Sequence, residues 1–173
     1  MRKAFTLIEM MIAIVVFSVI VVFLYKSYDT LKLSNMKYLR ISKDMQRLWR
    51  IKKMLFLDFA LSLKSDVSVL NQEKNEDVVL LQTSNSLHNR FYPYIAYIVK
   101  DGTLYRLESL YKLTYPLDAD TRADIDEIAK VKRFRIYKAL KKEAEHTVTY
   151  YLIDMKLENG EEMLYKVRAF NEA

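Results

Sequence analysis

Glu9 is the residue whose position in this sequence raises the clearest chemical question. It lies in the segment Ala4–Tyr25, in which the only other clearly polar side chains are those of Thr6 and Ser18. An ionisable side chain in the hydrocarbon of a membrane costs roughly 2–4 kcal/mol on insertion scales, so an acid in such a segment usually has a function. The Glu9 carboxylate therefore requires a partner that can neutralise it.

The other residues that could do chemistry do not form a catalytic or metal-binding pattern. His88 and His146 are isolated, and the chain has no cysteine, which excludes thiolate chemistry and disulfides. Both glycines lie in predicted hairpin turns, so no Gly-rich loop can hold a phosphate. The acidic run Asp118–Glu127 lacks the glycine of an EF-hand, and Ala129 replaces its bidentate glutamate. We therefore predict a protein that is not an enzyme, with no cofactor and no metal site.

The apolar N-terminal segment is long enough to span a bilayer. As a helix, Phe5–Tyr25 would measure about 31 Å at about 1.5 Å per residue. A cleaved secretory signal would need a small-x-small site after its apolar core, and Leu24–Tyr28 contains none. An uncleaved membrane anchor would explain the length of the segment but would leave Glu9 without a partner.

A cut between Ala4 and Phe5 would agree with the length of the apolar segment and would also give Glu9 a partner. The new α-amine of Phe5 would lie one helical turn before Glu9. It could neutralise the carboxylate within one chain or between neighbouring chains, as membrane-embedded charges usually require. Ala4 also has the small side chain that a peptidase could accommodate at the cut.

The stretch KAFTLIEMMIAIVVF resembles the prepilin signature of the type IV pilin and pseudopilin superfamily. The resemblance covers residues 2–25: a short leader with Arg2 and Lys3, a cleavage site before Phe5, Thr-Leu-x-Glu and an unbroken apolar helix. It implies that prepilin peptidase cuts the Ala4–Phe5 bond and that Phe5 becomes the N-methylated first residue. It also implies that Glu9 sets subunit register in a filament. The family usually has glycine before the cut, and this chain has alanine.

The sequence predicts a single helix of two halves from about residue 5 to residue 62, because no proline or glycine occurs before Pro93. Beyond the membrane segment, basic residues lie largely off one apolar stripe. Solvation, anionic lipid head groups, acidic faces of neighbouring subunits or nucleic acid could each explain the basic face. The stripe consists of Tyr38, Ile41, Met45, Leu48, Leu55 and Phe59.

After residue 64 the apolar period becomes alternating, which predicts about seven strands in meander order. Asp101-Gly102 and Asn159-Gly160 are predicted to be two-residue hairpin turns. The acids of Asp118–Ala129 are predicted to cap a short helix, and Phe134–Leu140 to form a strand. The predicted fold is α+β and pilin-like: a long N-terminal helix, with a transmembrane half and an amphipathic half, packs on an antiparallel β-sheet or pair of sheets.

The predicted regions follow from these elements. They are a cleaved leader at 1–4, a transmembrane and assembly helix at 5–25, an amphipathic helix at 26–63 that continues into the soluble domain, and an antiparallel β-rich periplasmic domain at 64–173. Basic residues flank the apolar segment on both sides, so the positive-inside rule does not set its orientation. The resemblance implies a single pass through the bacterial inner membrane, with the N-terminus in the cytoplasm and the C-terminal domain in the periplasm.

The soluble part resembles that of the J-type minor pseudopilins of type II secretion systems. The similarity rests on the helix end at Leu55–Asp58, the strand Val78–Gln82 and the tyrosine-rich hairpin Tyr94–Arg106. It implies a structural subunit in the tip or initiation complex of a pseudopilus. The implied partners are other major and minor pilins or pseudopilins, prepilin peptidase, the inner-membrane assembly platform and the lipid bilayer. The alternative is a minor pilin of a type IV pilus or a DNA-uptake (competence) filament, whose basic helix face contacts DNA.

Overall fold

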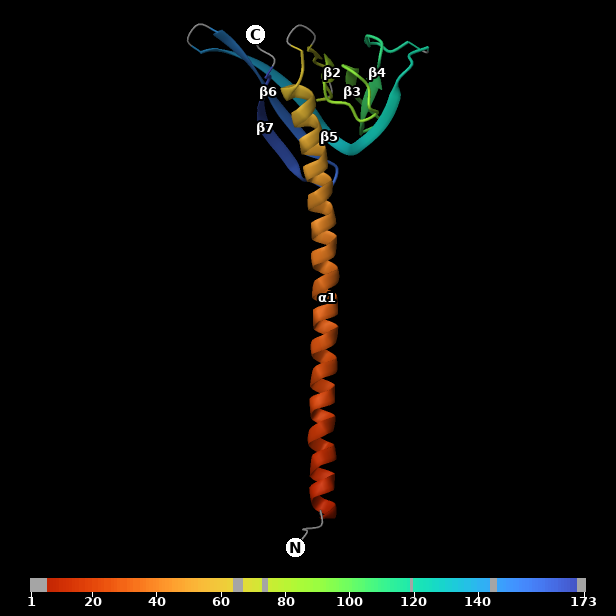
Figure 1. The fold of residues 1–173 in the computed structure, drawn as a ribbon, viewed down its shortest axis with the longest axis vertical. Helices are drawn as coiled ribbons and strands as arrows, with labels where there is room; N and C mark the ends of the chain where they lie inside the picture. Colours follow the sequence, from red (N-terminus) through yellow and green to blue (C-terminus); the bar gives the residue numbers. More distant parts are fainter. Residues whose placement is uncertain (1–5, 64–66, 73–74, 119, 144–145, 171–173) are drawn as a thin grey trace. The chain divides into compact units, whose positions relative to one another are not determined.

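The computed structural model of the chain describes residues 6–63, 67–72, 75–118, 120–143 and 146–170. Within these residues, one helix is followed by seven strands (Figure 1). The elements are α1 (Leu7–Ala60), β1 (Ser68–Leu70), β2 (Val78–Gln82), β3 (Tyr94–Lys100), β4 (Thr103–Ser109), β5 (Asp124–Glu143), β6 (His146–Leu157) and β7 (Glu162–Arg168).

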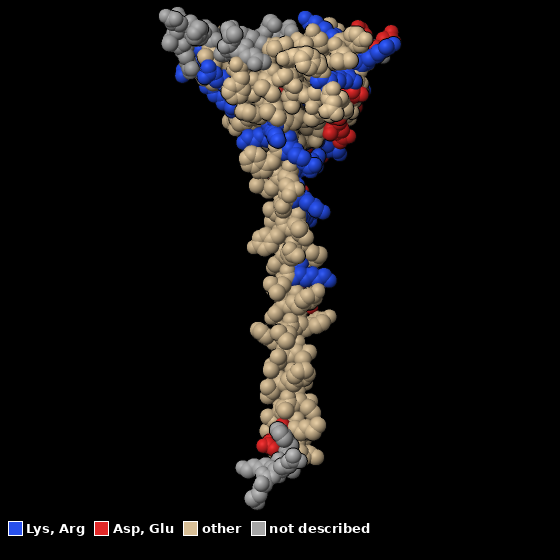
Figure 2. Space-filling model, viewed as in Figure 1, with Lys and Arg blue, Asp and Glu red and all other residues tan. Residues whose placement is uncertain are grey.

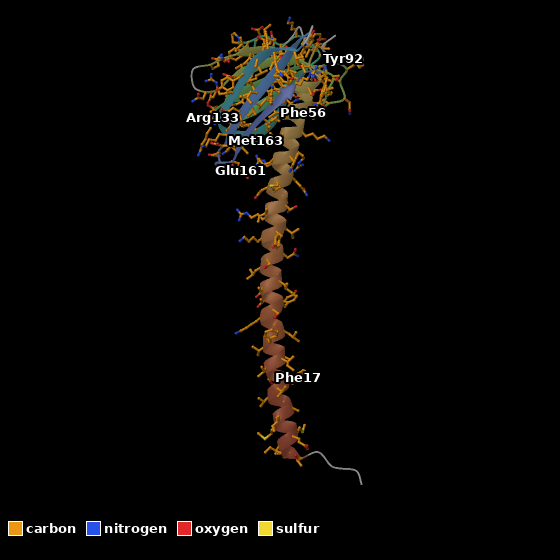
Figure 3. The ribbon with its side chains drawn as sticks, turned by 90° about the vertical axis from the view of Figure 1, so that its left-hand side faces the viewer. Phe17, Phe56, Tyr92, Arg133, Glu161 and Met163 are labelled. Carbon is orange, nitrogen blue, oxygen red and sulfur yellow. The ribbon has the colours of Figure 1, made fainter. Side chains whose placement is uncertain are left out.

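The chain divides into two compact units, Met1–Trp49 and Arg50–Ala173, and the boundary falls inside α1. In the first unit, every large apolar side chain between Leu7 and Tyr25 is at least 44% exposed. Phe17, for example, projects outward from the helix (Figure 3). By length and composition, α1 is the one helix among the described residues that could cross a membrane. A helix that is apolar on all sides is typically covered by lipid or by other helices.

The ends of α1 agree with the prediction to within two residues. The helix begins at residue 7, where residue 5 was predicted, and ends at residue 60, where residue 62 was predicted. The helix is continuous because no residue in it breaks the hydrogen-bond ladder. At its C-terminal end, the Ser62 hydroxyl donates to the Phe59 carbonyl oxygen at 2.7 Å. Ser62 then pairs with Thr83, so the chain passes directly from the helix to the sheet.

The seven strands lie in chain order, and each pairs with its neighbours in antiparallel fashion. Between β3 and β4, Asp101 and Gly102 both have positive φ, at 51° and 72°, which confirms the predicted two-residue turn. Between β6 and β7, the hairpin is confirmed but its turn is longer than predicted. The Leu157 N–H donates to the Glu161 carbonyl there, and Gly160 supplies the positive φ of 91°.

The predicted short helix at Asp118–Ala129 is wrong. Residues 124–129 belong to β5, which continues to Glu143 and so also contains the predicted strand Phe134–Leu140. The first part of β5 pairs with β4, and the part from Val131 onward pairs with β6 (Figure 1). Pairing across a sheet outweighed the local helix signal, because strand formation depends on neighbouring strands more than on local sequence.

The core of the second unit lies between the last turns of α1 and the sheet. Ile51, Leu55 and Phe59 recur every four residues on one face of the helix and are buried. Phe59 packs on Tyr97 of β3 and Tyr151 of β6, with ring centroids 6.5 and 5.2 Å apart. The structure therefore confirms an α+β fold in which a long N-terminal helix packs on an antiparallel sheet.

Candidate assembly site

Thr6 and Glu9 form a capping box at the start of α1. The Thr6 N–H and hydroxyl donate to Glu9 Oε2 at 2.9 and 3.0 Å, and the Glu9 N–H donates to Thr6 Oγ1 at 3.4 Å. These reciprocal bonds satisfy N–H groups that the first helical turn leaves without partners. Sequence reasoning missed this arrangement, although Thr-x-x-Glu before an apolar run is its usual signature.

The capping box gives Glu9 a local partner without removing its charge. Thr6 supplies neutral donors, and the start of a helix favours an anion through the helix dipole. Both residues follow the predicted cut, so the box contains no residue of the predicted leader. Glu9 is exposed in the isolated chain. A cation is therefore still needed when the carboxylate enters hydrocarbon or a helix bundle.

Four of the five predicted site residues lie outside the described residues: Arg2, Lys3, Ala4 and Phe5. The structure places the fifth, Glu9, in the first turn of α1. The meeting of the Phe5 amine with the Glu9 carboxylate therefore stays a prediction. What the described part supplies is one carboxylate at the start of an exposed apolar helix, which suits packing beside like helices.

A second group of charged side chains is buried where the end of α1 meets β3 and β4. Arg106 Nε lies 2.8 Å from Asp58 Oδ2, and Arg106 Nη1 lies 2.6 Å from Glu108 Oε2. The Tyr97 hydroxyl donates to Asp58, and the Asn85 side-chain amide donates to the other Asp58 oxygen at 2.6 Å. Asp58, Tyr97, Arg106 and Glu108 are fully buried. This buried ion cluster fixes the end of the helix on the sheet.

Charge pairing shifts the pKa values of Arg106 and Glu108 in the directions that favour their ionised forms. Burial lowers the pKa of Arg106, but the hydrogen bond and charge of Asp58 outweigh burial and raise that pKa above its ordinary value. Burial raises the pKa of Glu108, but hydrogen bonds from Ser86 and Arg106 bring it below its ordinary value. Burial and the Asp58 charge raise the pKa of Tyr97, so its phenol stays protonated and donates.

Sequence reasoning also missed the buried ion cluster, although two signals for it were present. Asp58 interrupts the apolar face of the helix, immediately before Phe59. Arg106 and Glu108 are two residues apart in β4, so they share the face that α1 covers. Because none of these side chains reaches solvent, the cluster positions the helix end and is not a ligand site.

His88 holds the loop between β2 and β3 against β5. Its Nε2 lies 2.9 Å from Asp126 Oδ2 and its Nδ1 lies 3.9 Å from Asp124 Oδ2. Arg90 of the same loop pairs with Asp124. The hydrogen bond with Asp126 is the main cause that raises the pKa of His88 above its ordinary value. This loop also carries Phe91, which is 83% exposed.

We expect attachment of this loop to depend on pH. A raised pKa means that folding favours the protonated ring, so this stabilisation is complete below the unfolded pKa of about 6.5 and is lost as pH rises through the higher folded pKa. An NMR titration of the full chain in micelles should place the His88 pKa above 6.5, and Asp126→Asn should lower it. Asp154→Asn, which removes an acid paired with Arg133 instead, should leave it unchanged. A His88 pKa that does not respond to Asp126→Asn would contradict the pairing.

Fold and site together define a chain whose first unit is an exposed apolar helix with an acid at its start. Residues 1–25 match the family described as the prokaryotic N-terminal methylation motif. This is the type IV prepilin signature, and it supports the pilin and pseudopilin superfamily. Comparisons of the chain with curated proteins and with solved structures gave no match.

The motif supports a type IV pilin-like filament subunit and points to a structural role. It implies processing by prepilin peptidase and assembly with other pilins. The apolar helix and the motif together fit a single-pass, membrane-anchored protein.

Proposed function

We propose that this chain is a minor pseudopilin, a structural subunit in the tip or initiation complex of a type II secretion pseudopilus. The observation that carries the proposal is the methylation motif at residues 1–25 followed by an unbroken, exposed apolar helix. The secretion role is supported by the similarity of the helix end at Asp58 and of the hairpin β3–β4 to J-type subunits. The absence of a proline near the midpoint of the membrane helix and of a C-terminal cysteine pair also argues against a major type IV pilin.

In this role the chain works by assembly. Before assembly, residues 5–25 hold the subunit in the inner membrane, with residues 1–4 in the cytoplasm and residues 64–173 in the periplasm. Prepilin peptidase cuts the bond between Ala4 and Phe5, and Phe5 is methylated. The helix of residues 5–25, which continues as the amphipathic helix at 26–63, then packs beside the corresponding helices of other subunits. The inner-membrane assembly platform carries out this step. Glu9 sets the register, because a carboxylate left unpaired inside a bundle costs several kcal/mol, about 3–5 by analogy with broken buried ion pairs.

The alternative function is a minor pilin of a type IV pilus or a DNA-uptake filament. The observation that favours it is a set of exposed basic residues on α1: Lys37, Arg40, Lys43 and Arg47. Figure 2 shows separate Lys and Arg side chains along part of the helix. Binding of DNA by the full chain in micelles should then fall steeply with salt, because each phosphate contact releases counterions. Deletion of the gene should impair DNA uptake in this case, whereas the pseudopilin role predicts a loss of protein secretion with uptake unchanged.

Mass spectrometry of the mature chain tests the processing on which both roles depend. We expect N-methyl-Phe5 as the first residue in cells with active prepilin peptidase. Ala4→Gly restores the residue that the family usually has before the cut, and it should be processed at least as completely. A large residue there, as in Ala4→Trp, should leave the leader attached. An intact Met1 in the wild-type chain from peptidase-containing cells would contradict the processing.

A further inference from the structure

Three strand edges of the second unit pair with no other strand among the described residues: those of β1, of β7 and of the first part of β5. β1 has only three residues, so it offers few backbone groups. The first part of β5 has a register shift opposite Leu104, and two of its acids are held by His88 and Arg90 of the β2–β3 loop. β7 pairs with β6 over seven consecutive residues without a shift. The edge of β7 is therefore the most regular template for another strand.

Hydrogen bonds at the two ends of β7 show which of its backbone groups face away from β6. The Leu157 N–H donates to the Glu161 carbonyl at 2.8 Å, and the Ala169 N–H donates to the Thr149 carbonyl at 3.4 Å. Bonded and non-bonded pairs alternate along an antiparallel ladder, so the odd-numbered residues of β7 bond to β6. The backbone N–H and C=O groups of the even-numbered residues therefore point away from β6.

The end of α1 occupies one of these outward groups. The N–H of Phe170, the next even-numbered residue after β7, donates to the Ala60 carbonyl at 2.7 Å. About two helical turns before Ala60, the Lys52 ammonium lies 5.3 Å from the centroid of the Tyr165 ring. The last turns of α1 thus lie beside β7, as Figures 1 and 3 also show. The outward groups at the centre of β7 have no such partner among the described residues, so the edge is open there.

The centre of this edge presents an apolar side chain and a cation on one face of the strand. Leu164 is 66% exposed. The Lys166 ammonium lies 3.6 Å from the centroid of the Tyr150 ring and has no acidic partner among the described residues. The acid before them, Glu162, is already held by Lys156 at 2.7 Å. The edge therefore complements a strand with an apolar residue and an acid two positions apart.

We propose that β7 binds one extended segment of a different pilin-like subunit as an added strand. The outward N–H and C=O groups of Leu164 and Lys166 bond to the backbone of this segment, as in other cases of strand addition. The segment places an apolar residue beside Leu164 and an acid beside Lys166.

The position of the edge argues for a neighbouring subunit as the occupant. Because the last turns of α1 lie beside β7, a subunit whose helix packs beside them brings its own soluble part to this edge. The inference rests on the proposed function and adds to it the contact by which this chain joins a different subunit. One segment fills the open edge, so the contact is made once per chain, as a minor subunit in a tip or initiation complex requires.

Hydrogen exchange with a model peptide tests the strand addition. The probe is acetyl-Thr-Val-Thr-Glu-Thr-Val-Thr-amide, whose sequence is the same in both directions and so fits either orientation. In the full chain in micelles, the Leu164 and Lys166 amides should exchange about five-fold more slowly at about four times the peptide Kd, because bound chains are protected. The Tyr165 and Val167 amides, which bond to β6, should be protected with and without peptide. Absence of binding, or unchanged exchange at Leu164 and Lys166, would overturn the proposal.

Charge reversal tests the acid beside Lys166. Lys166→Glu should weaken binding of this peptide about five-fold, because two like charges then lie side by side. A peptide with Lys in place of Glu should bind this variant more tightly than it binds the wild-type chain. Lys138→Glu reverses an exposed charge of β5 and should change neither affinity. If Lys166 only keeps the edge from pairing, Lys166→Glu will not weaken binding of the acidic peptide, and the proposal fails.

Two variants of Leu164 separate its backbone from its side chain. Leu164→Pro removes an outward N–H without removing a bond to β6, so proline is compatible with this edge. Leu164→Ala shortens the side chain and keeps the N–H. Peptide binding should be lost in Leu164→Pro and only weakened in Leu164→Ala. Protection of the Tyr165 and Val167 amides shows in each variant that β7 still pairs with β6, and equal affinities of two such folded variants would overturn the backbone contact.

Cross-linking identifies the source of the segment in cells that contain the complete secretion or pilus gene cluster. Benzoylphenylalanine in place of Leu164 should cross-link to a different subunit that carries the prepilin signature, as identified by mass spectrometry. The same group in place of Leu140, which is 67% exposed, is the matched control and should give no such product. A product with a second copy of this chain, or with an exported protein, would overturn the proposal.

Deletion of the gene keeps this inference distinct from the function on which it rests. Normal protein secretion in the deletion strain contradicts the pseudopilin role. A cross-link from position 164 to another prepilin-type subunit then still supports the contact. Loss of secretion without that cross-link supports the role and overturns the contact alone.

Discussion

Arg106→Met should lower the free energy of unfolding by about 3–5 kcal/mol. The substitution leaves Asp58 and Glu108 as buried carboxylates without the cation that lies between them. It keeps a long unbranched side chain in the same space, so lost packing contributes little. Urea denaturation of the full chain in micelles, followed by the near-UV circular dichroism of the core tyrosines, measures the change in the second unit.

Two further variants separate loss of charge pairing from a general effect of losing an arginine. Arg133→Met removes a half-buried arginine paired with Asp154 near the surface, and it should cost about 1 kcal/mol or less. The triple variant that combines Arg106→Met with Asp58→Asn and Glu108→Gln should recover much of the lost free energy of unfolding. In this variant no unpaired charge remains buried. An Arg106→Met variant no less stable than Arg133→Met would show that the buried ion cluster does not hold the helix end on the sheet.

Glu9→Ala should lower incorporation of the subunit into filaments at least ten-fold, while its insertion into the membrane stays normal. The factor follows from losing a carboxylate that is paired in the bundle, since about 1.4 kcal/mol already corresponds to ten-fold in an equilibrium. The measurement compares the subunit in the sheared filament fraction with that in the membrane fraction. Glu9→Gln keeps the shape without the charge, and we expect it to be nearly as defective.

Thr6→Val separates a role of Glu9 between subunits from its role in the capping box. This variant removes the hydroxyl that bonds to the carboxylate and should cost about 1 kcal/mol of local helix stability. If Glu9 sets register through a neighbouring charge, Thr6→Val should assemble almost normally. Equal defects in Thr6→Val and Glu9→Ala would show that the cap, and not the register, accounts for the acid.

The fold was largely predictable because its signals are local and repeated. The absence of proline and glycine over the first half of the chain predicted one continuous helix. Asp101-Gly102 predicted a hairpin because both residues tolerate positive φ. The start of β5 was not predictable in the same way. Asp124–Ala129 has the acids of a helix N-terminus, and only its pairing with β4 makes it a strand.

The candidate site was predictable only where its residues are neighbours in the sequence. Glu9 was found because one acid stands out in an apolar run, and its bond with Thr6 could have been read from the same few residues. The sequence signals of the buried ion cluster mark Asp58 and the pair Arg106 and Glu108 separately, but they do not join them, because Arg106 is 48 residues from Asp58 in the chain. Both signs of charge occur throughout the sequence, so no local pattern shows which arginine lies against which acid.

The order of the strands also bears on how the domain folds. Each strand pairs with the strand before it, so the loops that pairing must close are short, and short loops cost less chain entropy and close faster. The contacts that span longer loops include Arg106 with Asp58 and Phe134 with Glu76. We therefore expect the sheet to grow strand by strand, N-terminal strands first, and to join the end of the helix afterwards.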